Sequence, residues 1–173
     1  MASVIEIHRQ NEALIARLES MSAAELAALK ADSVGIYLQA MWSMPTFDAR
    51  DGTLDGAVAS GKLGLIRDSQ LRDRLVEWKA RVEDSTEEAG ELRAAAGRVL
   101  GRMTELGGPW GGDTPGIGPA FTNPDLADMM RHFPSGSLTL AVNDAELMGA
   151  VREKRLRAVM YLAALLGLSD QAN

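Results

Sequence analysis

The chain has 173 residues, a net charge of −6 and no cysteine, and this length is enough for one domain with a core of its own. The absence of cysteine excludes disulfides, thiolate catalysis and cysteine-ligated metals, and the acidic charge predicts no nucleic-acid partner because phosphate backbones would be repelled. Hydrophobic residues make up 46% of the chain but aromatic residues only 5%, so the core should consist mainly of small and aliphatic side chains, a composition that favours helices.

The chain up to Met44 carries apolar side chains at helical spacing. The first helix is predicted over about residues 3–20. Ser22 with Glu25 forms a capping-box pattern, at which a second helix begins or the first continues after a break. Helical periodicity then extends to Met44, and Pro45 ends it because the residue before a proline avoids the helical conformation.

Residues 45–68 are predicted to be mostly irregular. A turn is expected at Gly52, followed by a short helix over residues 54–60 with Thr53 as its N-cap. Gly61 then stands where the end of a helix favours a left-handed conformation. Three apolar residues after it are expected to tuck under the bundle: Leu63, Leu65 and Ile66.

The strongest pattern in the sequence is a heptad repeat over about residues 69–106. Apolar or small residues alternate at spacings of four and three without interruption: Leu71, Leu75, Trp78, Val82, Ser85, Ala89, Leu92, Ala96, Val99, Met103 and Leu106. A single helix of this extent would be about 55 Å long. It should therefore be the spine of an elongated bundle or the seam of a dimer.

The last third of the chain is predicted to contain a loop and a long helix. Residues 107–123 are rich in glycine and proline and read as a loop, after which Asn123-Pro124 begins another helix. Residues 138–142 have no strand to pair with, so we expect extended chain or a helical turn. The final helix is predicted over residues 144–168, and its basic residues should form a solvated face: Arg152, Lys154, Arg155 and Arg157.

Together these elements predict one all-α domain spanning residues 1–173. Its architecture is an elongated antiparallel helical bundle around the heptad-patterned helix, about residues 69–106. The N-terminal helix and the C-terminal helix would be the other two long members. Two irregular segments, 45–68 and 107–135, are expected to cap the ends of the bundle.

The sequence offers little chemistry for a metal or for catalysis. Glu83, Glu87 and Glu91 repeat every four residues, but this face is expected to be solvated. A carboxylate-bridged metal site in a bundle also needs Glu-x-x-His pairs, which His8 and His132 do not form; both are predicted at the surface or its boundary. No serine lies in a nucleophile-elbow pattern. We therefore expect no metal, no cofactor and no enzymatic activity.

The loop over residues 107–123 is the leading candidate for a small-ligand site. Trp42, Trp110 and Phe121 are predicted to line an apolar pocket at that end of the bundle, or Trp110 simply pins the loop to the bundle. The loop has neither the lysine of a phosphate-binding loop nor a preceding strand, so it gives no support to nucleotide binding.

The segment from Gln39 to Val82 carries a distinctive set of residues: Gly52, Thr53, Leu54, Ser60, Gly61, Lys62, Leu63, Ile66, Leu71, Arg72, Leu75 and Trp78. With this set the segment resembles a family of uncharacterised bacterial proteins in which one N-terminal membrane-spanning helix precedes a helical domain. The resemblance implies an extracytoplasmic, membrane-tethered domain at the periplasmic face of the inner membrane, but it suggests no particular activity. Any membrane contact is expected through an anchor that this chain lacks.

These observations favour a non-enzymatic sensing or protein-interaction domain. Its partner would be another protein, or a second copy of the chain associating through the helices. A small-ligand-binding bundle is the alternative prediction.

Overall fold

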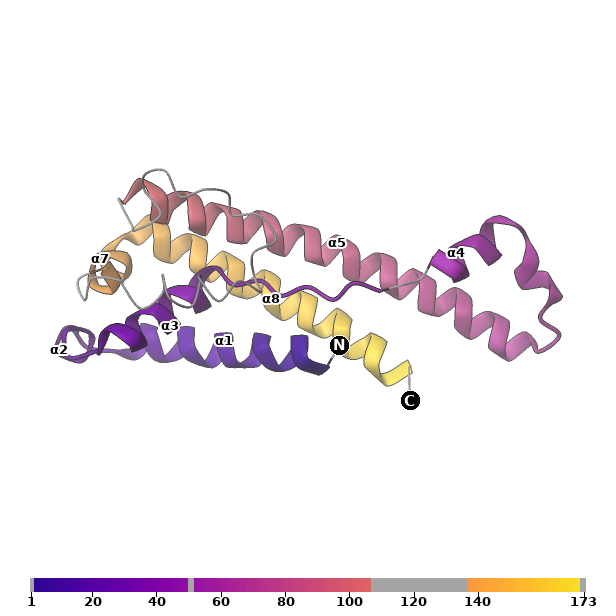
Figure 1. Cartoon of the computed structure of the whole chain (residues 1–173), viewed down its shortest axis with the longest axis horizontal. Coiled ribbons are helices and arrows are strands. Elements are labelled where there is room, and N and C mark those ends of the chain that lie inside the picture. Colours follow the sequence, from indigo (N-terminus) through magenta and orange to yellow (C-terminus); the bar gives the residue numbers. More distant parts are fainter. Residues whose placement is uncertain (1, 50–51, 107–136, 172–173) are drawn as a thin grey trace.

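The computed structural model describes residues 2–49, 52–106 and 137–171, and every regular element in these ranges is a helix. Three long helices form the body: α1 (Ala2–Ser20), α5 (Ser69–Glu105) and α8 (Ala145–Gln171). The shorter elements are α2 (Ala23–Ala27), α3 (Ala31–Trp42), α4 (Gly52–Ala59), the 3-10 helix η1 (Lys62–Leu65) and α7 (Ser137–Asn143). Figure 1 shows an elongated arrangement along α5, so the predicted all-α bundle is confirmed.

The side chain of Asp68 caps the start of the long helix α5. Asp68 Oδ1 accepts hydrogen bonds from the backbone N–H groups of Gln70, at 2.9 Å, and Leu71, at 3.2 Å, which satisfies donors that lack a partner inside the helix. The buried residues of α5 are Val82, Ser85, Ala89, Leu92, Ala95, Ala96, Val99 and Met103. All of them except Ala95 are heptad positions, so over this part of α5 the repeat forms the internal seam of the chain.

Helix α8 packs along this seam in the opposite direction. Near the C-terminal end of α5, Arg102 Nη2 lies 2.7 Å from Asp144 Oδ2, just before α8 begins. Near the other end, Arg81 Nη1 donates to the carbonyl of Gly167 at 3.2 Å. The two helices therefore run antiparallel. Small residues on the seam, such as Ala89 and Ala96, permit close helix approach.

Two clusters of apolar side chains make up the core. The larger brings α3 against α1 and against the ends of α5 and α8 that lie near α7; it includes Trp42, Ile15, Val99 and Leu147. The smaller gathers the start of α1, the middle of α5 and the end of α8, and its most buried members are Leu92, Leu165 and Leu168. The core is mainly aliphatic, as the composition predicts.

The short segments and the helix ends largely follow the predictions. Residues 137–143 form the helix α7, which is the helical one of the two expected outcomes. Asp144 caps α8, because its Oδ1 accepts a hydrogen bond from the backbone N–H of Leu147 at 2.7 Å. Gly61 has the expected left-handed conformation, with φ of 70°.

Residues 45–68 do not fold over the end of the bundle. Residues 43–49, which we call the strap, have no regular structure and run from the end of α3 towards α4 (Figure 1). Helices α4 and η1 then lie beside the N-terminal part of α5, away from the other long helices. The prediction that the apolar group after Gly61 tucks under the bundle is wrong: Leu65 is 78% exposed, and Leu63 and Ile66 are only half-buried.

Substitution of Leu92 by alanine tests whether the α5 seam is the main source of stability. Leu92 is fully buried, so we expect Leu92→Ala to lower the free energy of unfolding by about 2–5 kcal/mol in urea titrations. Leu140→Ala is the matched control, because Leu140 is 65% exposed on α7, and a change within about 0.5 kcal/mol is expected there. Equal effects of the two substitutions would contradict the assignment of the seam.

Candidate functional site

Four polar side chains from α1 and α8 are withdrawn from solvent where these helices meet the strap. Lys154 is 1% exposed and His8 3% exposed, and Asn11 and Tyr161 are buried with them. We call these residues the polar cluster. The predictions that His8 lies at the surface or its boundary, and that Lys154 lies on a solvated face, are both wrong.

Three members of the polar cluster bind backbone groups of the chain that leaves α3. Lys154 Nζ donates to the carbonyl of Ala40, in the last turn of α3, at 3.0 Å. His8 Nε2 lies 2.7 Å from the carbonyl of Pro45, so its N–H donates to that oxygen. Tyr161 Oη accepts from the backbone N–H of Phe47 at 2.6 Å. Side chains of α1 and α8 thus fix the course of the strap.

Burial sets the protonation states in the polar cluster. It lowers the pKa of His8 below the usual 6.5, against the opposing effect of the Pro45 carbonyl, and the positive charge of Lys154 lowers it further. Burial also lowers the pKa of Lys154 to about 8, although the carboxylate of Glu12 raises it. Near neutral pH His8 is therefore uncharged, and its ring meets the ring of Tyr161 edge-on with centroids 5.5 Å apart.

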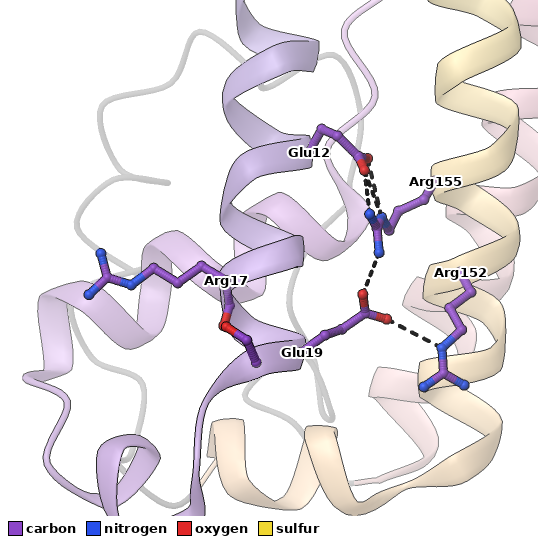
Figure 2. A network of polar contacts seen from close by, with 6 residues as sticks. Glu12, Arg17, Glu19, Arg152 and Arg155 are labelled. Atoms are coloured by element: carbon purple, nitrogen blue, oxygen red, sulfur yellow. Dashed lines mark hydrogen bonds and ion pairs between the residues drawn. The ribbon is translucent and has the colours of Figure 1, made fainter.

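An ion-pair network lies beside the polar cluster and joins α1 to α8. Arg155 pairs with both Glu12 and Glu19, and Arg152 Nε lies 3.3 Å from Glu19 Oε1. Figure 2 shows these side chains pointing towards one another between the two helices, whereas Arg17 points away. The basic run of α8 is therefore only partly a solvated face, since Arg155 is half-buried and bridges two carboxylates.

The polar cluster has the character of a structural joint: it holds α1 and α8 to the end of α3 and to the strap. The Nε2 of His8, the ammonium of Lys154 and the hydroxyl of Tyr161 are each engaged with a backbone group. His8 Nδ1 and Asn11 Nδ2 are buried without a hydrogen-bond partner, a cost in stability that neighbouring packing must offset. Within the described ranges, no three histidine or carboxylate side chains are grouped as a metal site requires.

An open hollow of about 330 Å³ lies where α1, α7 and α8 approach one another. Its polar lining includes Glu19 and Arg152, which already pair with each other. A ligand site normally offers a few convergent polar groups in a concave apolar pocket. The hollow therefore gives the ligand-binding alternative little support.

Of the three residues predicted to line a ligand pocket, the structure describes only Trp42. Trp42 is 2% exposed and belongs to the larger core cluster, together with Ile15 and Val99. Trp110 and Phe121 lie outside the described residues, as does His132. The pocket near residues 107–123 thus stays a prediction.

Several large apolar side chains are exposed on the part of the chain that extends beyond α8. Residues 52–77, comprising α4, η1 and the first turns of α5, contain no buried residue; we call them the arm (Figure 1). Its exposed large apolar side chains are Val58, Leu65, Leu71 and Val76. Sequence reasoning located the heptad positions here but missed their exposure, because exposure depends on where α8 ends.

Comparison with family models, with curated proteins and with solved structures finds no match to this chain. Among the described helices, none combines the length and the hydropathy that a membrane crossing requires. The candidate site therefore depends on the geometry of the arm itself.

The length difference between α5 and α8 explains why the arm is uncovered. Arg81 contacts Gly167, and α8 ends at Gln171, about one turn further on. Heptad positions Leu71 and Leu75 lie beyond that point, so α8 does not cover them. Helix α4 is held to α5 by Asp55, whose Oδ1 lies 2.8 Å from Lys79 Nζ.

The lowered pKa of His8 predicts a specific loss of stability in mild acid. Unfolded chains bind a proton on this residue at higher pH than the folded chain does, so the free energy of unfolding should fall as the pH falls through about 6.5. The measurement is urea unfolding at pH 7.5 and pH 5.5. His8→Gln keeps an N–H donor but cannot titrate, and should show a smaller fall; an identical fall would exclude His8 as the cause.

The lowered pKa of Lys154 predicts that stability also increases with pH in mild base. The unfolded chain keeps the lysine protonated up to about pH 10.5 and the folded chain only to about 8. This contribution to the free energy of unfolding should therefore rise across that window, by up to about 3 kcal/mol. Urea unfolding from pH 7.5 to 9.5 measures the rise while avoiding most tyrosine ionisation. Lys154→Met should lack it, and a parallel rise in that variant would refute the prediction.

Proposed function

We propose that this protein is a non-enzymatic protein-interaction domain and that the arm is its binding surface. The observation that carries the proposal is the absence of any buried residue in the arm, although Leu65, Leu71 and Val76 are large and apolar. Helices gain most of their stability by burying an apolar face against another element. A contiguous exposed apolar surface on a soluble domain marks an interaction site.

The rest of the chain supports a role in holding this surface out from the bundle. The polar cluster fixes the strap, which leads directly to the arm, and the α5 helix continues unbroken from the core into the arm. A rigid helix is a better support for a binding surface than a mobile loop, because less conformational entropy is lost on binding. The arm is thus presented in one orientation.

The location of the domain is a proposal from the sequence resemblance. Residues 39–82 resemble the family of membrane-tethered extracytoplasmic proteins, and the arm lies wholly within them. We propose that the domain works at the periplasmic face of the inner membrane, tethered there by a membrane anchor. Sensing of an external signal would then be read out through the partner bound to the arm.

Substitution of two exposed apolar residues of the arm tests this function. Leu65→Asp combined with Leu71→Asp should leave the fold intact, because neither side chain is buried, and should reduce capture of a partner from source-cell extracts at least about tenfold. Quantitative mass spectrometry of proteins retained by the immobilised full chain measures this loss.

The matched control is Leu140→Asp combined with Leu156→Asp, since both residues are exposed apolar side chains outside the arm. Circular dichroism should give the same helix content for the two double variants. Retention of the same proteins in the same amounts by both would show that the arm is not the binding surface.

A further inference from the structure

The apolar stripe of α5, formed by its heptad positions, continues from the core into the arm through Leu71 and Leu75. Leu71 and Leu75 continue the heptad register of Val82 and Ala89, which pack in the core between the long helices. Leu71 is 48% exposed because α8 ends before reaching it. The continuous register means that the missing counterpart has the shape of another helix, with its own narrow apolar stripe.

The charged residues beside the apolar stripe of α5 indicate which charge a partner helix should carry. In a heptad register the e and g positions flank the apolar seam and select the partner. Arg72 and Arg74 occupy these positions beside Leu71 and Leu75, and Lys79 and Arg81 occupy the next pair. All four are basic, in a chain whose net charge is −6.

Most acidic groups of the arm are already engaged within the chain. Asp55 pairs with Lys79, Glu77 pairs with Arg81, and Asp68 caps α5. Its basic residues, by contrast, form no ion pair with any described residue: Lys62, Arg67, Arg72 and Arg74. Although the arm carries four acidic and four basic side chains, the charge left free to meet a partner is therefore mainly positive.

We propose that the arm binds an acidic amphipathic helix of a partner protein. The apolar stripe of that helix packs against Leu71 and Leu75, and its flanking Asp and Glu side chains pair with Arg72 and Arg74. This inference rests on the proposed function and adds the chemical class of the partner. The helix takes the place that α8 leaves vacant at the end of the α5 seam.

Two other occupants fit the same surface less well. A second copy packed seam to seam would bring Arg72 and Arg74 against their counterparts, which is unfavourable for like charges. An anionic membrane favours a helix with a wide apolar face and a strongly basic polar face. The arm instead has a narrow stripe, and Asp73 and Glu77 lie among its basic residues.

The test uses a synthetic 28-residue peptide of four heptads, with Leu at a and d and Glu at e and g. A peptide with Lys replacing every Glu is its control. Fluorescence anisotropy of each labelled peptide is followed against the full chain at low and high salt. We expect the Glu peptide to bind at least tenfold more tightly than the Lys peptide, and to weaken as salt increases, because exposed charge pairs are screened.

Charge-reversed variants of the chain assign this binding to the arm. Arg72→Glu with Arg74→Glu should weaken binding of the Glu peptide at least tenfold. Arg9→Glu with Arg17→Glu makes the same change of net charge at exposed positions of α1 and should leave binding unchanged. Equal binding of the two peptides, or equal affinity of the two double variants, would overturn the inference.

Failure of this inference is distinguishable from failure of the proposed function. If both peptides bind equally and Leu65→Asp with Leu71→Asp abolishes both, the arm binds helices without selecting charge, and only the acidic partner class is wrong. If neither peptide binds but light scattering gives a dimer that the Leu65→Asp, Leu71→Asp variant dissociates, a second copy is the occupant. If anionic vesicles bind the arm and the peptides do not, the occupant is a lipid surface.

Discussion

The antiparallel seam between α5 and α8 is the interaction on which the rest of the structure depends. Small residues at Ser85, Ala89 and Ala96 bring the two helices close together, and Leu92 and Val99 fill the space between them. Arg102 with Asp144, and Arg98 with Glu153, pair across the same interface. Apolar burial supplies the stability, because largely exposed ion pairs such as Arg98 with Glu153 contribute little. The pairs chiefly favour one register over its alternatives.

The third long helix, α1, packs against α8 through buried polar side chains. Where α1 meets α8, the chain buries His8, Asn11 and Lys154 and thereby pins the strap. Buried polar groups cost free energy unless each finds a partner, and a fully apolar joint would cost less. The polar joint, however, recognises backbone atoms at defined positions, so it directs the chain from α3 towards α4. A purely apolar contact would restrain that path less specifically.

The arm follows from a mismatch in helix length. Helix α5 has 37 residues and α8 has 27, so two helices that begin in register at one end cannot finish together at the other. The part of α5 that α8 does not cover keeps the heptad pattern of the covered part. Its apolar side chains, however, lie next to solvent and the small helix α4 instead of packing against α8. An exposed apolar surface thereby arises from the same heptad pattern that builds the core, and its basic flanks distinguish it from the rest of an acidic molecule.

The sequence by itself determined the features that depend on local periodicity and on the conformation of single residues: the helical class, the extent of α5 and the left-handed turn at Gly61. These follow from neighbouring residues, whose preferences act within a few turns of helix. Only the tertiary structure decided that Lys154 and His8 are buried and that Leu65 and Leu71 are exposed. A lysine in a basic run reads as solvated, and a heptad leucine reads as core, until the lengths and directions of distant helices are known. Burial is a property of what packs against a residue, and those neighbours lie far away in the chain.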